Sequence, residues 1–207
     1  MKQQTTVSPT DRLLVAAAGK RLVVFDLDNT LMDETQYLFA GYDAVARVAA
    51  GGSASLARNL TAWLRDEFQS GGRERLFERM AEHYPGVQGT VGDWLNELRT
   101  VKVSLAMLPW VAPFCDALPH AALAILTNGN AVQQRNKYHQ LQPAELRERM
   151  RLYCAAESKP KPSPAGLWSI LEDSHCPPFA ALFIGDTATD EACAAAAGVP
   201  FAWAPPL

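Results

Sequence analysis

The sequence has few cysteines, no long hydrophobic run and no cluster of positive charge. Its cysteines show neither a Cys-x-x-Cys pair nor a metal-ligand spacing; they are Cys115, Cys154, Cys176 and Cys193. We expect buried free thiols in a reducing compartment. No apolar stretch is long enough to span a membrane, and the polar start of the chain is unlike a secretion signal. We therefore predict a cytoplasmic protein with no membrane partner.

The lack of a Lys- or Arg-rich segment removes the charge signature of a protein that binds a nucleic acid polymer. The 207 residues carry 19 Lys and Arg against 22 Asp and Glu, a formal net charge of −3. A small phosphorylated molecule is still compatible with this balance, because a few local cations suffice to hold one phosphate group. Hydrophobic residues make up 48% of the chain, which is enough for one full core and a smaller appended unit.

Short β-branched and apolar runs predict the buried strands of a parallel sheet. Helical patterns separate most of them, and this order is typical of an α/β protein with helices on both faces of the sheet. The predicted strands are residues 21–25, 121–126, 151–156, 181–185 and 199–204. In such a sheet, ligands bind beyond the carboxyl ends of the strands.

The stretch after the first strand has a different character. Apolar residues recur there at helical spacing, and glycines break the pattern into roughly four helices. We expect a small helical bundle inserted into the α/β unit. The predicted organisation is a tail over residues 1–20, an α/β core over 21–33 and 106–207, and the insert over 34–105.

Four polar segments each follow a predicted strand. They are "DLDNT" beginning at Asp26, "TNGN" beginning at Thr127, "SKPKP" around Lys159 and "GDTATD" beginning at Asp186. Because the carboxyl ends of parallel strands meet at one edge of a sheet, we expect the four segments to converge there. This convergence carries more weight than any one segment.

Four carboxylates would meet at that edge, those of Asp26, Asp28, Asp186 and Asp190. So many like charges need a cation among them, and hard oxygen ligands with open positions for water suit Mg²⁺. Lys161 and the hydroxyl and N–H groups around Thr127 would hold an incoming anion. A metal, a lysine and a hydroxyl together indicate a phosphate site suited to phosphoryl transfer.

The first two acids can share the chemistry of such a transfer. Asp26, at the end of the strand, can attack phosphorus and form an aspartyl-phosphate intermediate. Asp28 lies two residues on and therefore on the same side of an extended backbone. From there it can protonate the leaving oxygen and later take a proton from water.

The segments "FDLDNTL", "TNGN", "KPSP" and "GDTATD" resemble, in order, the four motifs of the haloacid dehalogenase superfamily, specifically of its phosphatases. "NGNAVQQRNK" is also similar to the stretch after the second motif in nucleotide and sugar-phosphate phosphatases, where a Gln and a Lys three residues later recur; Gln134 and Lys137 match them. The resemblance implies a Rossmann-like core, with the insert acting as a mobile cap.

The resemblance also implies the metal ligands. Asp26 would be both the nucleophile and a ligand of Mg²⁺, and Asp28 would be the general acid/base with its backbone carbonyl on the metal. Asp186 would bind the metal directly. Asp190 would bind it through water or orient the other ligands.

The phosphate-binding residues follow from the same motifs. Thr127 would hold the phosphate, with the Asn128 amide beside it. The catalytic lysine has two candidates, and Lys161 matches the Lys-Pro-x-Pro pattern with a bulky apolar residue six places on, Leu167. Lys159 is followed at that distance by Ala165. We therefore expect Lys161 to be the catalytic lysine.

Each motif alone also fits a structural role. These roles are an Asx turn at 28–30, a helix cap at 127–128, a solvated loop lysine at position 161 and the acidic first turn of a helix at Asp190. Their occurrence together and in order favours the catalytic interpretation.

The implied enzyme is a Mg²⁺-dependent phosphomonoesterase, a monomer or homodimer, acting on a small phosphate ester. A cap that excludes water and supplies contacts favours a small organic phosphate as substrate. The resemblance of "FDLDNTL" and "NGNAVQQRNK" to family motifs implies nucleoside monophosphates, FMN or sugar phosphates as the candidates. The insert offers six arginines as candidate contacts, Arg47, Arg58, Arg65, Arg73, Arg75 and Arg79. The alternatives are a phosphomutase, a haloacid dehalogenase and a phosphate-binding relative without catalysis.

Overall fold

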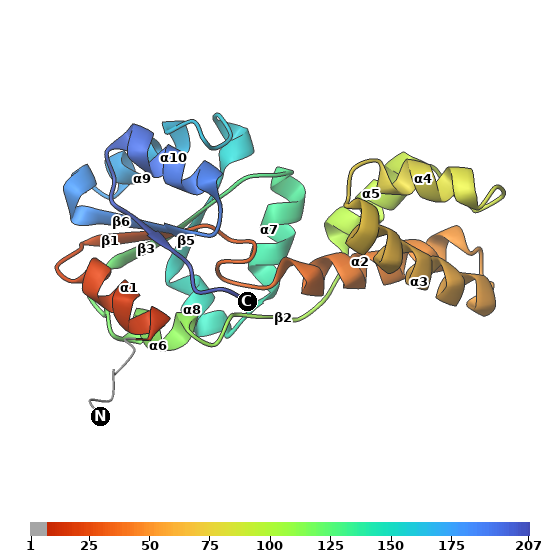
Figure 1. Ribbon diagram of the computed structural model, residues 1–207, viewed down its shortest axis with the longest axis horizontal. Helices are drawn as coiled ribbons and strands as arrows, with labels where there is room; N and C mark the ends of the chain where they lie inside the picture. Colours follow the sequence, from red (N-terminus) through yellow and green to blue (C-terminus); the bar gives the residue numbers. More distant parts are fainter. Residues whose placement is uncertain (1–7) are drawn as a thin grey trace, which may run out of the picture. The chain divides into compact units, whose positions relative to one another are not determined.

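The computed structural model describes residues 8–207, which form two compact units (Figure 1). We call them the α/β unit, which comprises the chain up to Asp33 together with Ser104–Leu207, and the helical unit, which is Glu34–Val103. Residues 1–7 of the predicted tail lie outside the described part. The rest of the tail contains helix α1 (Pro9–Ala17), which begins with a capping box between Ser8 and Asp11.

Five parallel strands form the sheet of the α/β unit, in the order β5-β3-β1-β6-β7. Their bounds are β1 (Leu22–Phe25), β3 (Ala122–Thr127), β5 (Met150–Cys154), β6 (Ala181–Gly185) and β7 (Phe201–Trp203). All five lie where the apolar runs predicted them. The predicted Rossmann-like α/β fold is confirmed.

Strand β1 occupies the centre of the sheet because its side chains are apolar on both faces. Its four residues, "LVVF", are at most 1% exposed, as expected for a strand covered on both sides. Leu22 pairs with Ala122 of β3 on one side and with Ala181 of β6 on the other. The chain therefore leaves β1 at the middle of the sheet edge, where Asp26 begins the first motif.

Helices cover both faces of this sheet (Figure 1). On one face lie α9 (Ala165–Asp173) and α10 (Ala188–Ala197), whose apolar residues form one buried cluster with β1, β3 and β6. On the other lie α1 and α6 (Val111–Asp116), where the rings of Trp110 and Phe114 pack against Phe25.

The remaining elements of the α/β unit are short, apart from one helix. They are α7 (Ala131–Gln140), α8 (Ala144–Glu148), the 3-10 turns η1 (Ala155–Glu157) and η2 (Pro178–Ala180), and the paired strands β2 (Leu105–Ala106) and β4 (Leu141–Gln142). Sequence patterns did not predict β2 and β4, because a strand of two residues is too short to show alternation. No helix among residues 8–207 is both long and apolar enough to cross a membrane.

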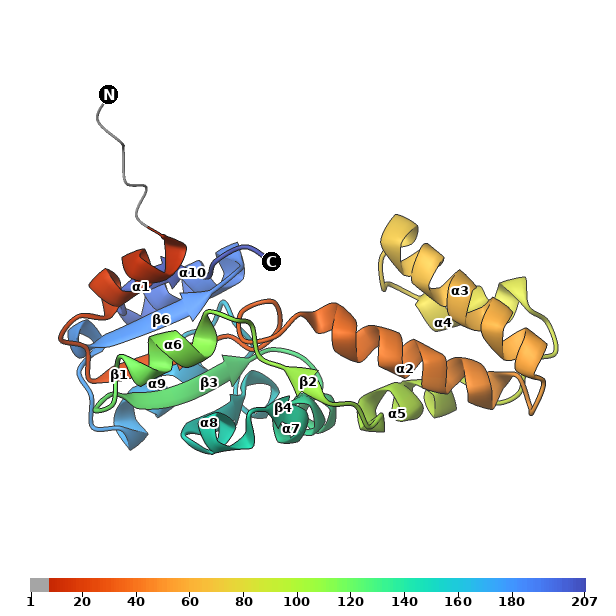
Figure 2. The ribbon, with the colours of Figure 1, turned by 90° about the horizontal axis from the view of Figure 1, so that it is seen from below.

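The helical unit contains four helices (Figure 2), and aromatic side chains pack between them. They are α2 (Glu34–Ala49), α3 (Ala54–Gly71), α4 (Leu76–His83) and α5 (Val91–Thr100). The rings of Tyr42, Phe77 and Trp94 contact one another in series, and Tyr42 and Trp94 are 1% exposed. Gly41 lets α2 approach α5 closely, since a Cβ there would lie 2.2 Å from the Cδ1 atom of Leu98.

Candidate active site

The polar segments of the α/β unit meet at the carboxyl edge of the sheet. Asp26 follows β1, and its N–H donates to the carbonyl of Ile184 at the end of β6. Thr127 is the last residue of β3, and Asp186 follows β6. Lys161 lies in the loop between η1 and α9. The parallel topology thus brings together residues as distant in the sequence as Asp26 and Asp186, which are 160 positions apart.

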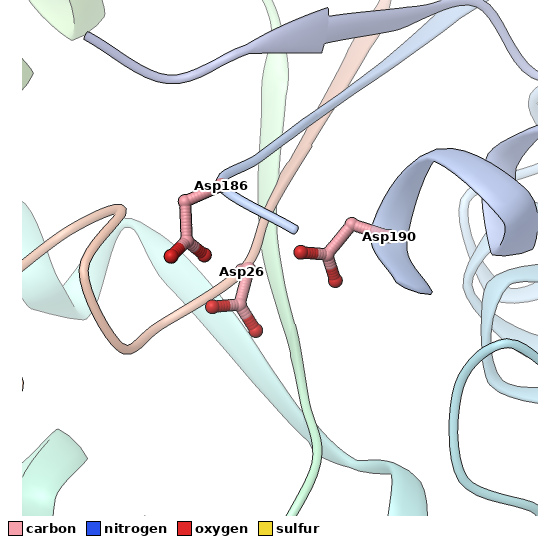
Figure 3. A group of neighbouring side chains, drawn as sticks. All are labelled: Asp26, Asp186 and Asp190. Atoms are coloured by element: carbon pink, nitrogen blue, oxygen red, sulfur yellow. The ribbon is translucent and has the colours of Figure 1, made fainter. Parts of the chain in front are cut away.

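Three carboxylates form the acidic centre of this edge (Figure 3). Asp26, Asp186 and Asp190 each offer one oxygen, and these oxygens all lie within 4.8 Å of one another. Asp26 and Asp190 are buried, at 7% and 1% exposure. Such a set of hard oxygen donors fits a divalent cation of the Mg²⁺ type. The carboxylate of Asp28, which we expected in the same group, lies outside this trio and contacts other residues described below.

Lys161 places its ammonium group against two of these acids. Its Nζ atom lies 2.5 Å from Oδ1 of Asp26 and 2.6 Å from Oδ1 of Asp190, and it donates to the carbonyl of Leu126 at 3.0 Å. The residue is 6% exposed, whereas Lys159 is exposed. Of the two lysines that precede proline, the structure brings Lys161 into the acidic centre.

Burial dominates the electrostatics of the acidic centre. It raises the pKa of Asp26 from 3.8 to about 7; Lys161 opposes this shift, while Asp190 and Asp28 add to it. The pKa of Asp186 is also raised, by burial and by Asp190. Burial lowers the pKa of Lys161, but Asp26 and Asp190 together raise it above its usual value. A divalent cation would favour the ionised form of every carboxylate here.

We expect Asp26→Asn to stabilise the metal-free protein at pH 8. The pKa of Asp26 is about 7 in the folded chain against 3.8 for an unperturbed aspartate, so the folded state binds more protons between those two pH values. Its contribution to stability is therefore present at low pH and is lost as pH rises through about 7. The free energy of unfolding, measured in EDTA, should be higher for the variant than for wild type at pH 8. We expect the difference to be a few kcal/mol at pH 8 and to narrow toward pH 5. A gap independent of pH would contradict this.

Asp190 serves the start of a helix and the acidic centre at once. It is the third residue of α10, and its Oδ2 atom accepts hydrogen bonds from N and Oγ1 of Thr187 at 3.1 and 2.6 Å. Its Oδ1 atom accepts from Lys161. Gly185 makes room for this arrangement, because a Cβ there would lie 2.6 Å from that of Asp190. Both oxygens are engaged by protein groups, which supports an orienting role for Asp190.

Thr127 and Asn128 connect the second motif to the third. Asn128 donates from Nδ2 to the carbonyl of Lys161 at 3.0 Å, and its Oδ1 accepts from the backbone N–H of Lys161 at 2.8 Å. This reciprocal pair fastens the lysine loop to β3, a structural role that the sequence analysis did not predict. Thr127 is 1% exposed and donates from its hydroxyl to the carbonyl of Asn128 at 3.2 Å.

Three further polar residues contact the predicted site. Thr30 is fully buried and donates to Oδ1 of Asp186 at 3.4 Å. Gln134 and Lys137 of α7 reach the carboxylate of Asp28. The sequence analysis matched the last two to a family pattern without assigning them a role. Their spacing was the available signal, since residues three apart lie on one face of a helix.

Most of the six arginines proposed as substrate contacts already have acidic partners within the helical unit. The pairs are Arg65 with Asp43 at 2.8 Å, Arg73 with Glu34 at 3.0 Å, Arg75 with Glu82 at 3.6 Å and Arg79 with Glu67 at 2.8 Å. Arg47 and Arg58 are exposed. Ion pairing within the unit accounts for the four paired side chains.

Comparison with known proteins identifies the class of this chain. Residues 23–204 match the haloacid dehalogenase-like hydrolase family, and the chain belongs to that family. A phosphoglycolate phosphatase of Pseudomonas savastanoi pv. phaseolicola (strain 1448A / Race 6) is 27% identical over 213 residues, covering 88% of this chain and 69% of that protein. The predicted superfamily is confirmed, and the protein is an enzyme of the hydrolase class.

Two solved structures illustrate how widely this fold is used. CbbY from Rhodobacter sphaeroides in complex with phosphate has a TM-score of 0.61 at 17% identity, covering 91% of this chain and 87% of that one. An L-2-haloacid dehalogenase has a TM-score of 0.60 at 21% identity, covering 91% and 86%. Both share the fold with this chain, so the reaction has to be argued from the site.

Proposed function

We propose that this hydrolase is a Mg²⁺-dependent phosphomonoesterase that acts on a small phosphorylated metabolite through an aspartyl-phosphate intermediate. The observation that carries the proposal is the buried carboxylate of Asp26, held 2.5 Å from the Lys161 ammonium group within an acidic trio that fits a divalent cation. The relative from Pseudomonas savastanoi supports phosphate ester hydrolysis as the reaction.

The first half of the reaction would transfer the phosphoryl group to the protein. An oxygen of Asp26 forms a bond to phosphorus as the bond between phosphorus and the leaving oxygen breaks, and the carboxyl group of Asp28 gives its proton to that oxygen. In the second half, Asp28 takes a proton from a water molecule. The water oxygen forms a bond to phosphorus as the bond between phosphorus and the Asp26 oxygen breaks, which regenerates the carboxylate of Asp26.

Other side chains would hold the transferring group during both halves. The Lys161 ammonium group and the Thr127 hydroxyl would each donate to phosphoryl oxygens. For this, Lys161 would give up part of its contact with Asp26. Asp26, Asp186 and the backbone carbonyl of Asp28 would hold Mg²⁺, with Asp190 orienting the set. The chemistry that Mg²⁺ supplies when bound is neutralisation of the charge on the phosphoryl group.

Asp28 separates this reaction from dehalogenation. Removing a halide requires no proton on the leaving group, whereas a departing alkoxide does. An acid two residues beyond the nucleophile therefore favours a phosphate ester as substrate. A phosphomutase would use the same residues, and it differs only in returning the phosphoryl group to a sugar instead of passing it to water.

Phosphate release from a panel of esters tests the proposal. The panel contains nucleoside monophosphates, FMN, sugar phosphates and, in view of the relative, 2-phosphoglycolate. We expect Mg²⁺ to support hydrolysis of at least one ester and excess EDTA to reduce the rate by about 100-fold or more. Release of halide from a 2-haloacid without metal, and of no phosphate from any ester, would identify a dehalogenase instead. Transfer of label between sugars without free phosphate would identify a mutase.

A further inference from the structure

Helix α7 carries two buried polar side chains that the mechanism above does not use. Gln134 and Lys137 are 2% and 1% exposed, although glutamine and lysine usually lie at the surface. They are three residues apart and therefore share one face of the helix. A lysine this deep in a protein is costly unless a charged partner meets it.

The partner of Lys137 is the carboxylate of Asp28. Its Nζ atom lies 2.7 Å from Oδ1 and 2.8 Å from Oδ2, and Nε2 of Gln134 donates to Oδ2 at 2.9 Å. Both oxygens of the carboxylate are thus bound by groups from α7, while 20% of the Asp28 side chain remains exposed. The Asp28 carboxylate therefore contacts α7 and is not a member of the trio formed by Asp26, Asp186 and Asp190.

Gln134 also connects this carboxylate to the second motif. Its Nε2 atom lies 2.7 Å from both Oγ1 of Thr127 and the carbonyl oxygen of Asn128. The carboxylate and the carbonyl can only accept, so the nitrogen of the amide has to face them. The amide nitrogen has two protons for these three acceptors, so its contact with Oγ1 of Thr127 shares a proton with one of the other two. The hydroxyl of Thr127 itself donates to the carbonyl of Asn128.

This arrangement leaves one atom of Gln134 without a partner. Its Oε1 atom is buried and has no hydrogen bond to any group in the described part of the chain. An unsatisfied buried acceptor costs about 1–3 kcal/mol, and stability alone would favour an apolar side chain here. The orientation of this amide therefore serves the contacts of its nitrogen with Asp28 and with the carbonyl of Asn128.

We propose that Gln134 and Lys137 are positioning residues, which hold the carboxylate of Asp28 at a fixed place beside the hydroxyl of Thr127. The inference rests on the proposed function, because it concerns the proton transfers assigned to Asp28. Without the two contacts to Lys137, the partly exposed carboxylate can rotate about its side-chain bonds. The proton donor then spends less time in line with the leaving oxygen.

The test compares Lys137→Met with a control variant, Arg135→Met. Arg135 is a cation on the same helix, but its partner is Glu157. The kcat/KM value reports the steps up to departure of the leaving group. For an alkyl phosphate, whose leaving oxygen needs a proton, Lys137→Met should lower kcat/KM by about 10–100-fold. For p-nitrophenyl phosphate, whose leaving group needs none, the loss should be several-fold smaller. Arg135→Met should match wild type on both esters.

A double-mutant cycle shows whether Lys137 acts through Asp28. In an Asp28→Asn background, Lys137→Met should have little further effect on the alkyl ester. Gln134→Glu, which puts an oxygen where the amide donates, should reproduce the substrate dependence of Lys137→Met. Equal losses on both esters, or an undiminished loss in the Asp28→Asn background, would overturn the proposal.

Failure of the proposed function would give a different result, because wild type itself would then hydrolyse neither ester. A crystal structure of Lys137→Met decides the positioning role in that case. We expect the Asp28 carboxylate to leave its place beside Thr127. A carboxylate that keeps its place would refute the role, whatever the activity.

Discussion

Asp26→Asn is expected to lower phosphate release by about 10⁴-fold or more, because the amide that replaces the carboxylate is a poor nucleophile for phosphorus. The side chain keeps its shape, so the change tests the chemistry rather than the packing. The measurement is kcat for the best ester of the panel in Mg²⁺. A second measurement is acid quenching with labelled substrate, which should trap label on wild-type protein and none on the variant.

The matched control for this variant is Asp116→Asn. The side chain of Asp116 is 73% exposed and pairs with Arg149 at 3.3 Å, away from the acidic trio. We expect wild-type kcat and wild-type trapping of label. If Asp26→Asn retains a tenth of the wild-type rate, Asp26 is not the nucleophile, and label trapped on the variant would direct the search to another residue.

Lys161→Met is expected to abolish turnover, whereas Lys159→Met should change kcat by less than about threefold. Removing the Lys161 ammonium group leaves the carboxylates of Asp26 and Asp190 facing each other without their shared cation. It also removes a donor to the transferring phosphoryl group. Lys159 is exposed and two residues away, which makes it a control of the same residue type in the same loop.

Loss of folding has to be separated from loss of catalysis in this experiment. Removing one partner of a buried ion pair costs about 3–5 kcal/mol, so melting curves with and without Mg²⁺ accompany the kinetics. Lys161→Arg keeps the charge and provides a folded comparison. Full activity in a folded Lys161→Met protein, or a larger loss from Lys159→Met, would contradict the assignment.

Much of the fold could be predicted from the sequence because its main strands are apolar runs. The "LVVF" of β1 is buried on both faces, and such a strand shows in composition alone. Strands β2 and β4 have two residues each and no pattern to detect. Their pairing depends on the path of the chain around them.

The candidate site was predictable in its composition but not in all its contacts. Motif order placed Asp26, Lys161 and Asp190 at one edge, where the structure has them in contact. The expected group of four carboxylates is a trio, because Asp28 is bound by side chains from α7. Helical spacing indicates that Gln134 and Lys137 share a face, yet only the packing of α7 decides which group that face meets.

The position of β1 in the sheet has a consequence for the newly made protein. This strand is synthesised before its two neighbours, which begin at residues 122 and 181. The central strand therefore has no partner in the sheet until those later segments are made, and contacts this distant along a chain form slowly. The helical unit, whose contacts are local, can fold earlier. A chain that stops before β6 would lack one side of its central strand as well as Asp186 and Asp190, so truncated products should be both inactive and prone to aggregation.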